Sequence, residues 1–196
     1  MELTDEEKKI LLTAARNSIR SLFTAVEIEE PDYGKYPELK IHAGAFVTLT
    51  EFGKLRGCIG YILSERQLFD TVCEAAVNSA ENDPRFQAVR EPELKNITIE
   101  ISILSPPFPL NSYEEIEIGK HGLILEETGR RGLLLPQVPI EHHMNKEQYL
   151  DAICQKAGFH PEYWRTKQLQ LHAFTADIFS EEVLTDHHKD SSTGSE

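Results

Sequence analysis

The segment Ile97–Ile103 constrains the fold more than any other stretch of this 196-residue chain. Isoleucine stands at every second position, and Thr98, Glu100 and Ser102 fill the positions between. A period of two places the isoleucines on one face of a β-strand and the polar residues on the other. The segment is therefore predicted to be a strand with one face in a core and the other outside it.

Helices and further strands are predicted on both sides of this strand. Capping boxes and apolar residues at helical spacing predict helices at residues 4–26, 64–82 and 145–157. Alternating or apolar runs bounded by turn residues predict strands at residues 45–52, 55–62, 116–118, 123–126, 132–135 and within 168–179. Because helices and strands mix without strict βαβ alternation, the predicted fold class is α+β.

The charge balance narrows the classes of partner. Lys and Arg number 20 and Asp and Glu number 33, which gives a formal net charge of −13. Nucleic-acid backbones and anionic membranes are bound by positive surfaces, so this balance argues against both. No apolar run approaches the roughly 20 residues that span a bilayer. A basic site confined to one small region stays compatible with the net charge.

The cysteines indicate a reducing compartment. Cys58, Cys73 and Cys154 are widely spaced, odd in number and lack a C-x-x-C pattern. With no export signal in the opening segment, a cytoplasmic location is expected. Cys73 and Cys154 lie on apolar helical stripes and are interpreted as core residues. Residues 183–196 are acidic, end in Ser, Thr and Gly, and are predicted to form a disordered tail after one domain at residues 1–182.

Familiar catalytic signatures are missing from the sequence. It holds no G-x-G pattern, no phosphate-binding loop, no G-x-S-x-G elbow and no H-E-x-x-H motif. Adjacent His142 and His143 would face opposite ways on an extended strand and make a poor chelate, so no metal site is expected. No cofactor can be assigned.

The stretch Leu55–Gly60 is the first candidate site. On a strand, Arg56 and Cys58 would project to the same face, while Gly57 and Gly60 leave room for another backbone or a ligand. A cation beside a thiol favours the thiolate, so Cys58 is a candidate nucleophile and Arg56 its activator. The alternative is that Cys58 is a small core residue in a tightly packed strand.

Four more residues complete the candidate site. Arg85 could bind a carboxylate or phosphate with Asp83 orienting it, or the two could simply lock a turn. His121, flanked by glycines, could bind an anion or move a proton, or could be a solvated turn residue. Gln137, between two prolines, could be a positioned amide donor or an ordinary loop residue.

The stretch Leu55–Gly60 is one of several short motifs that follow one another along the chain. The others are Gly44–Leu49, Asp83–Phe86, Glu93–Leu94, Ile99–Ser102, Gly119–Leu123, Arg131–Val138 and Lys156–Gly158. In this combination the chain resembles the AMMECR family, the AMME-syndrome candidate-region proteins, and more narrowly protein A of the AmmeMemoRadiSam system. The resemblance covers about residues 11–182. Members often carry Trp where this chain has Met144, so a site shaped by that aromatic ring would differ here.

The resemblance implies a fold and a set of partners but no reaction. It implies a mainly antiparallel sheet flanked by helices, in two unequal lobes with a cleft between them. The sequence itself offers the candidate hinge, since residues 105–110 include a stiff, proline-rich connector. A small or anionic ligand is then expected in that cleft near Arg56 and Cys58. The genes of this family often accompany the genes for a Memo-like protein and a radical-SAM enzyme. The alternative function is therefore a non-catalytic interaction module that works with one of these proteins.

Overall fold

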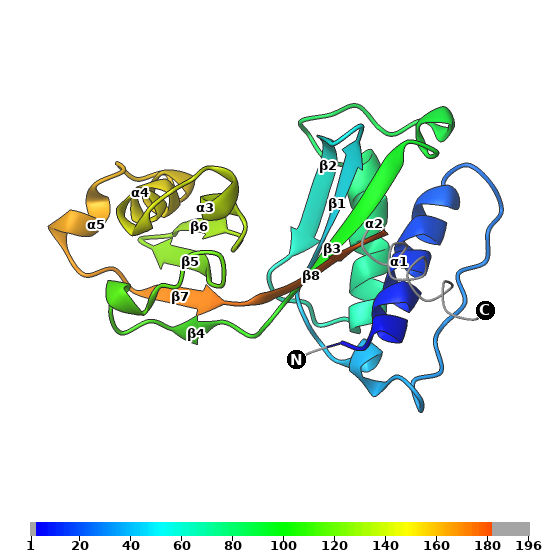
Figure 1. The fold of residues 1–196 in the computed structure, drawn as a ribbon, viewed down its shortest axis with the longest axis horizontal. Helices are drawn as coiled ribbons and strands as arrows, with labels where there is room; N and C mark the ends of the chain where they lie inside the picture. Colours follow the sequence, from blue (N-terminus) through cyan, green and yellow to red (C-terminus); the bar gives the residue numbers. More distant parts are fainter. Residues whose placement is uncertain (1–2, 182–196) are drawn as a thin grey trace, which may run out of the picture. The chain divides into compact units, whose positions relative to one another are not determined.

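The computed structural model describes residues 3–181, which divide into two compact units. The first unit holds residues 3–104 and 177–181, and the second holds residues 105–176 (Figure 1). Both ends of the described chain therefore belong to the first unit. The predicted acidic tail at 183–196 lies outside the described residues.

The first unit is a four-stranded sheet with two helices on one side (Figure 1). The strands lie in the order β2-β1-β3-β8, and β1 pairs antiparallel with both β2 and β3. Its elements are α1 (Asp5–Arg20), β1 (Ala45–Glu51), β2 (Lys54–Tyr61), α2 (Leu68–Glu81), β3 (Ile97–Leu104) and β8 (Ala176–Ser180), with short 3₁₀ turns at Pro37–Lys40 and Glu91–Glu93.

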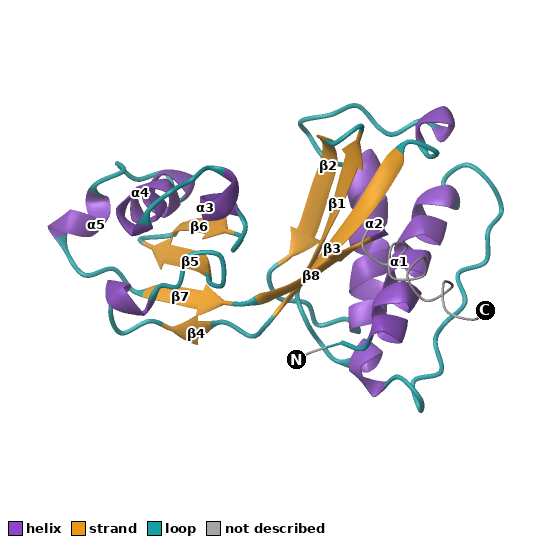
Figure 2. Ribbon diagram, in the orientation of Figure 1, coloured by secondary structure: helices purple, strands orange, loops and turns teal. Residues whose placement is uncertain are grey.

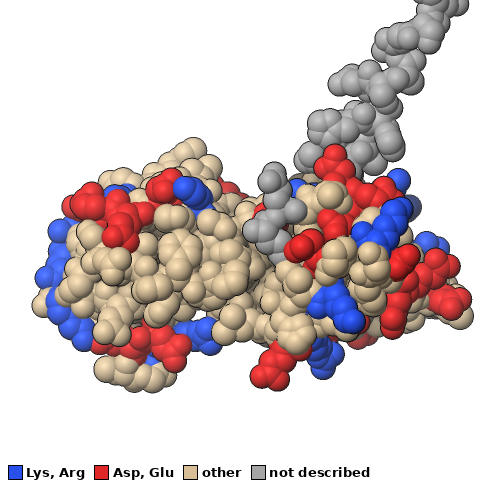
Figure 3. Space-filling view, turned by 90° about the horizontal axis from the view of Figure 1, so that it is seen from below, with Lys and Arg blue, Asp and Glu red and all other residues tan. Residues whose placement is uncertain are grey.

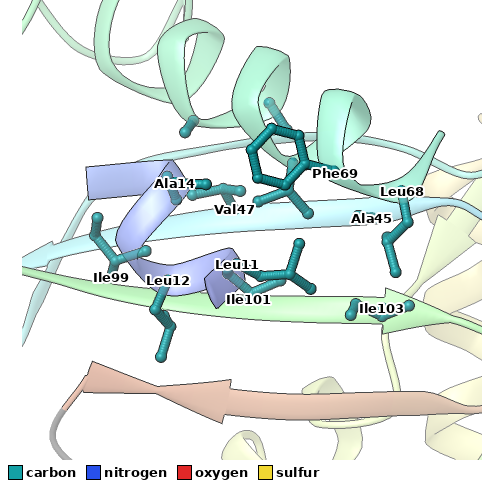
Figure 4. Packing of buried hydrophobic residues seen from close by; sticks show 14 of the residues in the cluster. Leu11, Leu12, Ala14, Ala45, Val47, Leu68, Phe69, Ile99, Ile101 and Ile103 are labelled. Atoms are coloured by element: carbon teal, nitrogen blue, oxygen red, sulfur yellow. The ribbon is translucent and has the colours of Figure 1, made fainter. Parts of the chain in front are cut away.

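The isoleucines of β3 lie in the core of this unit, as the alternation predicts. Ile99 and Ile101 are fully buried, and Val47 of β1 lies directly opposite Ile101. Helices α1 and α2 cover this inner face with residues such as Leu11 and Phe69 (Figure 4). The alternate residues of the same strands, Thr48 of β1 and Glu100 of β3 among them, therefore form an outer face that points away from the helices.

The second unit has its own sheet and its own core. The strands lie in the order β4-β7-β5-β6, all paired antiparallel, and helices accompany them (Figure 2). Tyr149 and Ile153 of α4 pack with Leu123 and Leu125 of β5 in the core. The elements are β4 (Phe108–Pro109), β5 (Gly122–Glu127), β6 (Arg130–Leu134), α3 (Val138–Glu141), α4 (Lys146–Lys156), α5 (Tyr163–Thr166) and β7 (Leu171–Phe174), with a 3₁₀ turn at Tyr113–Glu115.

The α+β class and the mainly antiparallel sheets are confirmed. The predicted capping boxes at Thr4 and Asn145 are both present, and each caps the helix that follows it. The first helix nevertheless ends at Arg20, because i→i+3 bonds such as Leu22 N to Ile19 O tighten its last turn into a loop. The predicted continuation to residue 26 is wrong.

Three other boundaries differ from the predictions. Ser64 does not cap α2: its hydroxyl accepts hydrogen bonds from Arg66 N in the preceding loop and from the Thr71 hydroxyl in the first turn of the helix, which begins at Leu68. Residues 116–118 form no strand, because Ile116 ends a 3₁₀ turn and inserts its side chain into the core. The last predicted strand is two strands, β7 and β8, which belong to different sheets.

Candidate functional site

A buried carboxylate organises the candidate site of the first unit. Asp83 follows α2 directly and is 4% exposed. Its Oδ2 accepts the backbone N–H of Cys58 at 2.8 Å, and its Oδ1 accepts the backbone N–H of Arg85 at 3.1 Å. The Arg85 guanidinium and these N–H groups hold the pKa of Asp83 far below its usual range. Asp83 is therefore an ionised anchor that ties the turn after α2 to β2.

The guanidinium of Arg85 is fixed by this anchor yet open on its other side. Arg85 donates from Nε to Asp83 Oδ1 at 2.9 Å and from Nη2 to Asp83 Oδ2 at 2.7 Å. Nη2 also lies 3.4 Å from the carbonyl oxygen of Cys58. The side chain is 54% exposed, and its Nη1 makes no hydrogen bond within the described part of the chain. A forked guanidinium with a spare donor is a preformed anion contact.

The thiol of Cys58 lies between Arg85 and the middle of the sheet. Thr48, directly opposite on β1, donates a hydrogen bond from Oγ1 to Cys58 Sγ at 3.3 Å. Burial raises the pKa of the Cys58 thiol; Thr48 and Arg85 oppose this, whereas Asp83 and Glu100 add to it. With its pKa raised, the thiol stays protonated at neutral pH and is a weak nucleophile there.

Arg56 serves a different purpose from the one its spacing indicates. The pairing of β1 with β2 shifts register between Leu49 and Thr50, opposite Arg56, so strict alternation breaks at this residue. Its Nε binds Glu93 Oε1 at 3.0 Å and its Nη1 binds the carbonyl oxygen of Gln87 at 2.8 Å. The cation whose charge acts on the Cys58 thiol is thus Arg85 rather than Arg56.

The two glycines of the motif allow close packing. A Cβ at Gly57 would lie 2.1 Å from the carbonyl oxygen of Ser79 on α2, and a Cβ at Gly60 would lie 2.4 Å from Cγ of Phe46. The Ser79 hydroxyl itself accepts the N–H of Ile59 at 2.8 Å and donates to the carbonyl of Val47 at 2.7 Å. Sequence reasoning missed Ser79 as a contact of the motif, although Ser79 lies within the helix predicted at residues 64–82.

His121 and Gln137 belong to the second unit and the other predicted site residues to the first. His121 is 7% exposed, accepts the backbone N–H of Glu117 through Nδ1 at 3.3 Å, and stands edge-on to the Phe108 ring. Gln137 precedes α3, and its buried Oε1 has no hydrogen-bond partner in the described chain. The first unit thus brings Cys58, Asp83 and Arg85 together, with Arg56 on the same strand.

Nowhere between residues 3 and 181 do three or more His, Cys, Asp or Glu side chains come together in a metal-binding arrangement. Over the same residues, every helix is too short or too polar to cross a membrane.

These features define an α+β protein of two antiparallel sheets with an anchored arginine beside a half-buried thiol. The AMMECR1 family model matches residues 12–179, and the chain belongs to the AMMECR1 family. It is 40% identical to Protein Mbar_A1807 of Methanosarcina barkeri, over 91% of this chain and 92% of that protein. Its structure resembles the crystal structure of the uncharacterized protein PH0010 of Pyrococcus horikoshii, with a TM-score of 0.84 and 38% identity, over 93% of this chain and 95% of that one.

Proposed function

We propose that this protein binds a small anionic ligand on the outer face of the sheet of its first unit, beside Cys58. The observation that carries the proposal is the Arg85 guanidinium, which is fixed by Asp83 while Nη1 stays available. An anion bound there would meet a donor that needs no reorganisation, because the fork on Asp83 has already set its orientation.

The neighbouring groups favour binding over covalent chemistry. Thr48 and Cys58 place a hydroxyl and a protonated thiol next to the guanidinium, and both are neutral polar groups. A nucleophilic cysteine needs a lowered pKa, whereas burial raises the pKa of this one. We therefore assign Cys58 to the ligand contact and name no reaction. His121 and Gln137 are not part of this proposed site.

The anion site is tested by titrating the full-length, isotopically labelled protein with inorganic phosphate and following backbone amide resonances. Saturable shifts are expected at Cys58 and Arg85, and Arg85→Gln should abolish them. Arg131→Gln is the matched control, since Arg131 is similarly exposed but belongs to the second unit. Shifts that persist in Arg85→Gln, or that never saturate in the native protein, would contradict the proposal.

The state of the thiol is tested by iodoacetamide labelling across pH, with the labelled cysteine identified by mass spectrometry. Alkylation of Cys58 should be slower than that of a model thiol at neutral pH and should rise only above the usual cysteine range. Fast labelling at neutral pH would restore the nucleophilic role and contradict a pure binding function.

A second candidate is a non-catalytic interaction module of the AmmeMemoRadiSam system that binds a Memo-like or radical-SAM protein. The observation that favours it is the tip of the β1–β2 hairpin, where Phe52 is 77% exposed and Leu55 is 43% exposed. A large exposed aromatic residue is a frequent anchor in protein interfaces. Co-purification with a Memo-like protein of the same genome, lost in Phe52→Ser, would support it; unchanged recovery of that protein with Phe52→Ser would count against it.

A cytoplasmic location completes the proposal. Cys58, Cys73 and Cys154 are all free thiols in the structure, which suits a reducing compartment. The face shown in Figure 3 carries Asp and Glu side chains as well as Lys and Arg side chains. Together with the net charge of −13, this argues against nucleic acid as the ligand.

A further inference from the structure

A groove in the first unit lies between α1 and the chain segment that follows this helix. Residues 25–31 form no helix or strand and run back along α1 (Figure 1). The groove between them has a volume of about 450 Å³, which is in the range of sites that hold ligands. One wall is residues 27–31, and the other is a single stripe of α1, at helical spacing, that includes Glu6, Lys9, Ile10, Thr13 and Asn17.

The backbone of the segment is not paired inside the protein. No N–H or C=O group of residues 25–31 forms a hydrogen bond within the described residues 3–181. Backbone groups of this kind can pair with an extended chain laid beside them, as the groups at the edge of a sheet do. The segment can therefore bind the main chain of a peptide.

Part of the groove is apolar. Ile10, Ile28 and Pro31 belong to its lining, and Ile10 and Ile28 also pack against the core of the first unit. The core therefore holds these two side chains in place, and they offer a contact to an apolar side chain of a partner.

The charged residues of the groove are mostly acidic. Four carboxylates line it, and Lys9 is the only basic residue among the described lining residues. None of the four carboxylates forms an ion pair within residues 3–181; they are Glu6, Glu27, Glu29 and Glu30. An excess of unpaired charge of one sign favours an occupant of the opposite sign.

We infer that this groove is a docking surface for an extended, basic segment of another protein that carries both apolar and Lys or Arg side chains. Its cations would meet the four carboxylates, its apolar side chains would contact Ile10 and Ile28, and its main chain would pair with residues 25–31. Residues 183–196 of this chain hold three acidic residues and one Lys, so their charge does not complement the groove. None of the lining residues belongs to the anion site, so the inference stands apart from the proposed function.

The test follows backbone amide resonances of the full-length, isotopically labelled protein during titration with peptides. The probe is the pentapeptide Lys-Ile-Lys-Ile-Lys with both ends blocked, and its counterpart carries Glu in place of each Lys. Saturable shifts are expected at Ile10, Thr13 and Ile28 with the basic peptide and none with the acidic one. Spermidine has the same charge as the basic peptide but no side chain or peptide backbone, and it should bind at least tenfold more weakly.

Variants locate the contact. A triple variant of the segment should bind the basic peptide about tenfold more weakly, because each exposed ion pair contributes up to about a fivefold change; its substitutions are Glu27→Gln, Glu29→Gln and Glu30→Gln. The matched control makes the same change in net charge on the second unit and should leave the affinity unchanged; its substitutions are Glu126→Gln, Glu141→Gln and Glu162→Gln.

All six substituted residues are exposed, and circular dichroism checks that both triple variants are folded. If either is unfolded, the comparison of the three probes on the native protein decides. Equal losses in the two variants, equal affinity for spermidine and the basic peptide, or shifts that do not saturate at the groove would overturn the inference. The phosphate titration at Arg85 does not depend on these outcomes, so the docking surface and the anion site can fail separately.

Discussion

Two arginine–carboxylate pairs flank the same strand and differ in what they leave available. Arg56 binds Glu93, and both side chains are mostly buried, at 15% and 14% exposed. Its remaining donors bind the carbonyl oxygens of Gln87 and Ala88. Arg85 binds Asp83 with an equally good fork, but the Arg85 side chain is 54% exposed whereas the Asp83 side chain is buried. Arg56 is enclosed by its partners, whereas Arg85 is bound by Asp83 on one side of its guanidinium and exposed on the other.

The Arg56–Glu93 pair therefore holds the strand in place, whereas the Arg85–Asp83 pair exposes a positive charge. An enclosed ion pair in which every guanidinium nitrogen is hydrogen-bonded holds the structure together, and removing one member leaves the other buried and uncompensated. A pair with one exposed member adds little stability, because water already solvates the exposed charge. Substitutions in the strand itself, in the Arg56–Glu93 pair and at Arg85 should therefore have successively smaller effects on stability.

The largest effect is expected for Gly57→Ala, which moves the strand that carries both pairs. The added Cβ would lie 2.1 Å from the backbone oxygen of Ser79, so β2 or α2 must shift. The free energy of unfolding should fall by more than about 3 kcal/mol in urea denaturation. Gly129→Ala is the control: its Cβ meets nothing within 4 Å, and its positive φ alone should cost about 1 kcal/mol. Equal losses in the two variants would contradict the packing role of Gly57.

Arg56→Ala should lower the free energy of unfolding by about 3 kcal/mol, because it leaves Glu93 buried without its main partner. Urea denaturation measures the loss. A loss below about 1 kcal/mol would show that this pair behaves like a surface ion pair and would remove the contrast with Arg85.

The Arg56–Glu93 ion pair should also make the free energy of unfolding depend on pH in a defined window. Arg56 lowers the pKa of Glu93 from 4.5 to about 2, so the folded state binds a proton less readily than the unfolded state. The contribution of Glu93 is therefore present above pH 4.5 and is lost as the pH falls towards 2. Glu93→Gln should cost roughly 2 kcal/mol at neutral pH and almost nothing near pH 2. A difference between native and variant protein that does not shrink in acid would contradict this assignment.

Arg85→Ala should have the smallest effect on stability, about 1 kcal/mol or less, since half of the side chain is already in water. Asp83 would keep its bonds to the backbone N–H groups of Cys58 and residue 85. Urea denaturation beside Arg56→Ala gives the direct comparison. A loss as large as that of Arg56→Ala would show that Arg85 also holds the structure together.

Local patterns in the sequence were enough to predict much of the fold. The alternation along Ile97–Ile103 predicts the inner face of β3, and the Asn145 capping box predicts where α4 begins. Each signal depends on residues within a few positions of one another. The Ser64 box failed because the Ser64 hydroxyl accepts hydrogen bonds from Arg66 N and from the Thr71 hydroxyl, and Thr71 is not part of the pattern.

The candidate site depended on contacts that local patterns do not contain. Asp83 reaches the N–H of Cys58 across 25 positions, and Arg56 reaches Glu93 across 37. Spacing identified Asp83 and Arg85 as a pair, with turn lock and ligand clamp as alternatives, and the structure shows a lock that leaves one guanidinium nitrogen available. The irregular pairing opposite Arg56 could not be read from the sequence, and it separates this arginine from the cysteine two residues away.

The bond between Asp83 and the N–H of Cys58 also bears on how the protein behaves at high concentration. Strand β2 is the outermost strand of its sheet, and such strands offer unpaired N–H and C=O groups to other chains. At Cys58 the N–H is bound by Asp83 and the C=O is approached by Arg85. The turn after α2 therefore blocks the middle of an exposed sheet margin, and the same contact that orients the arginine protects the molecule against strand-to-strand aggregation.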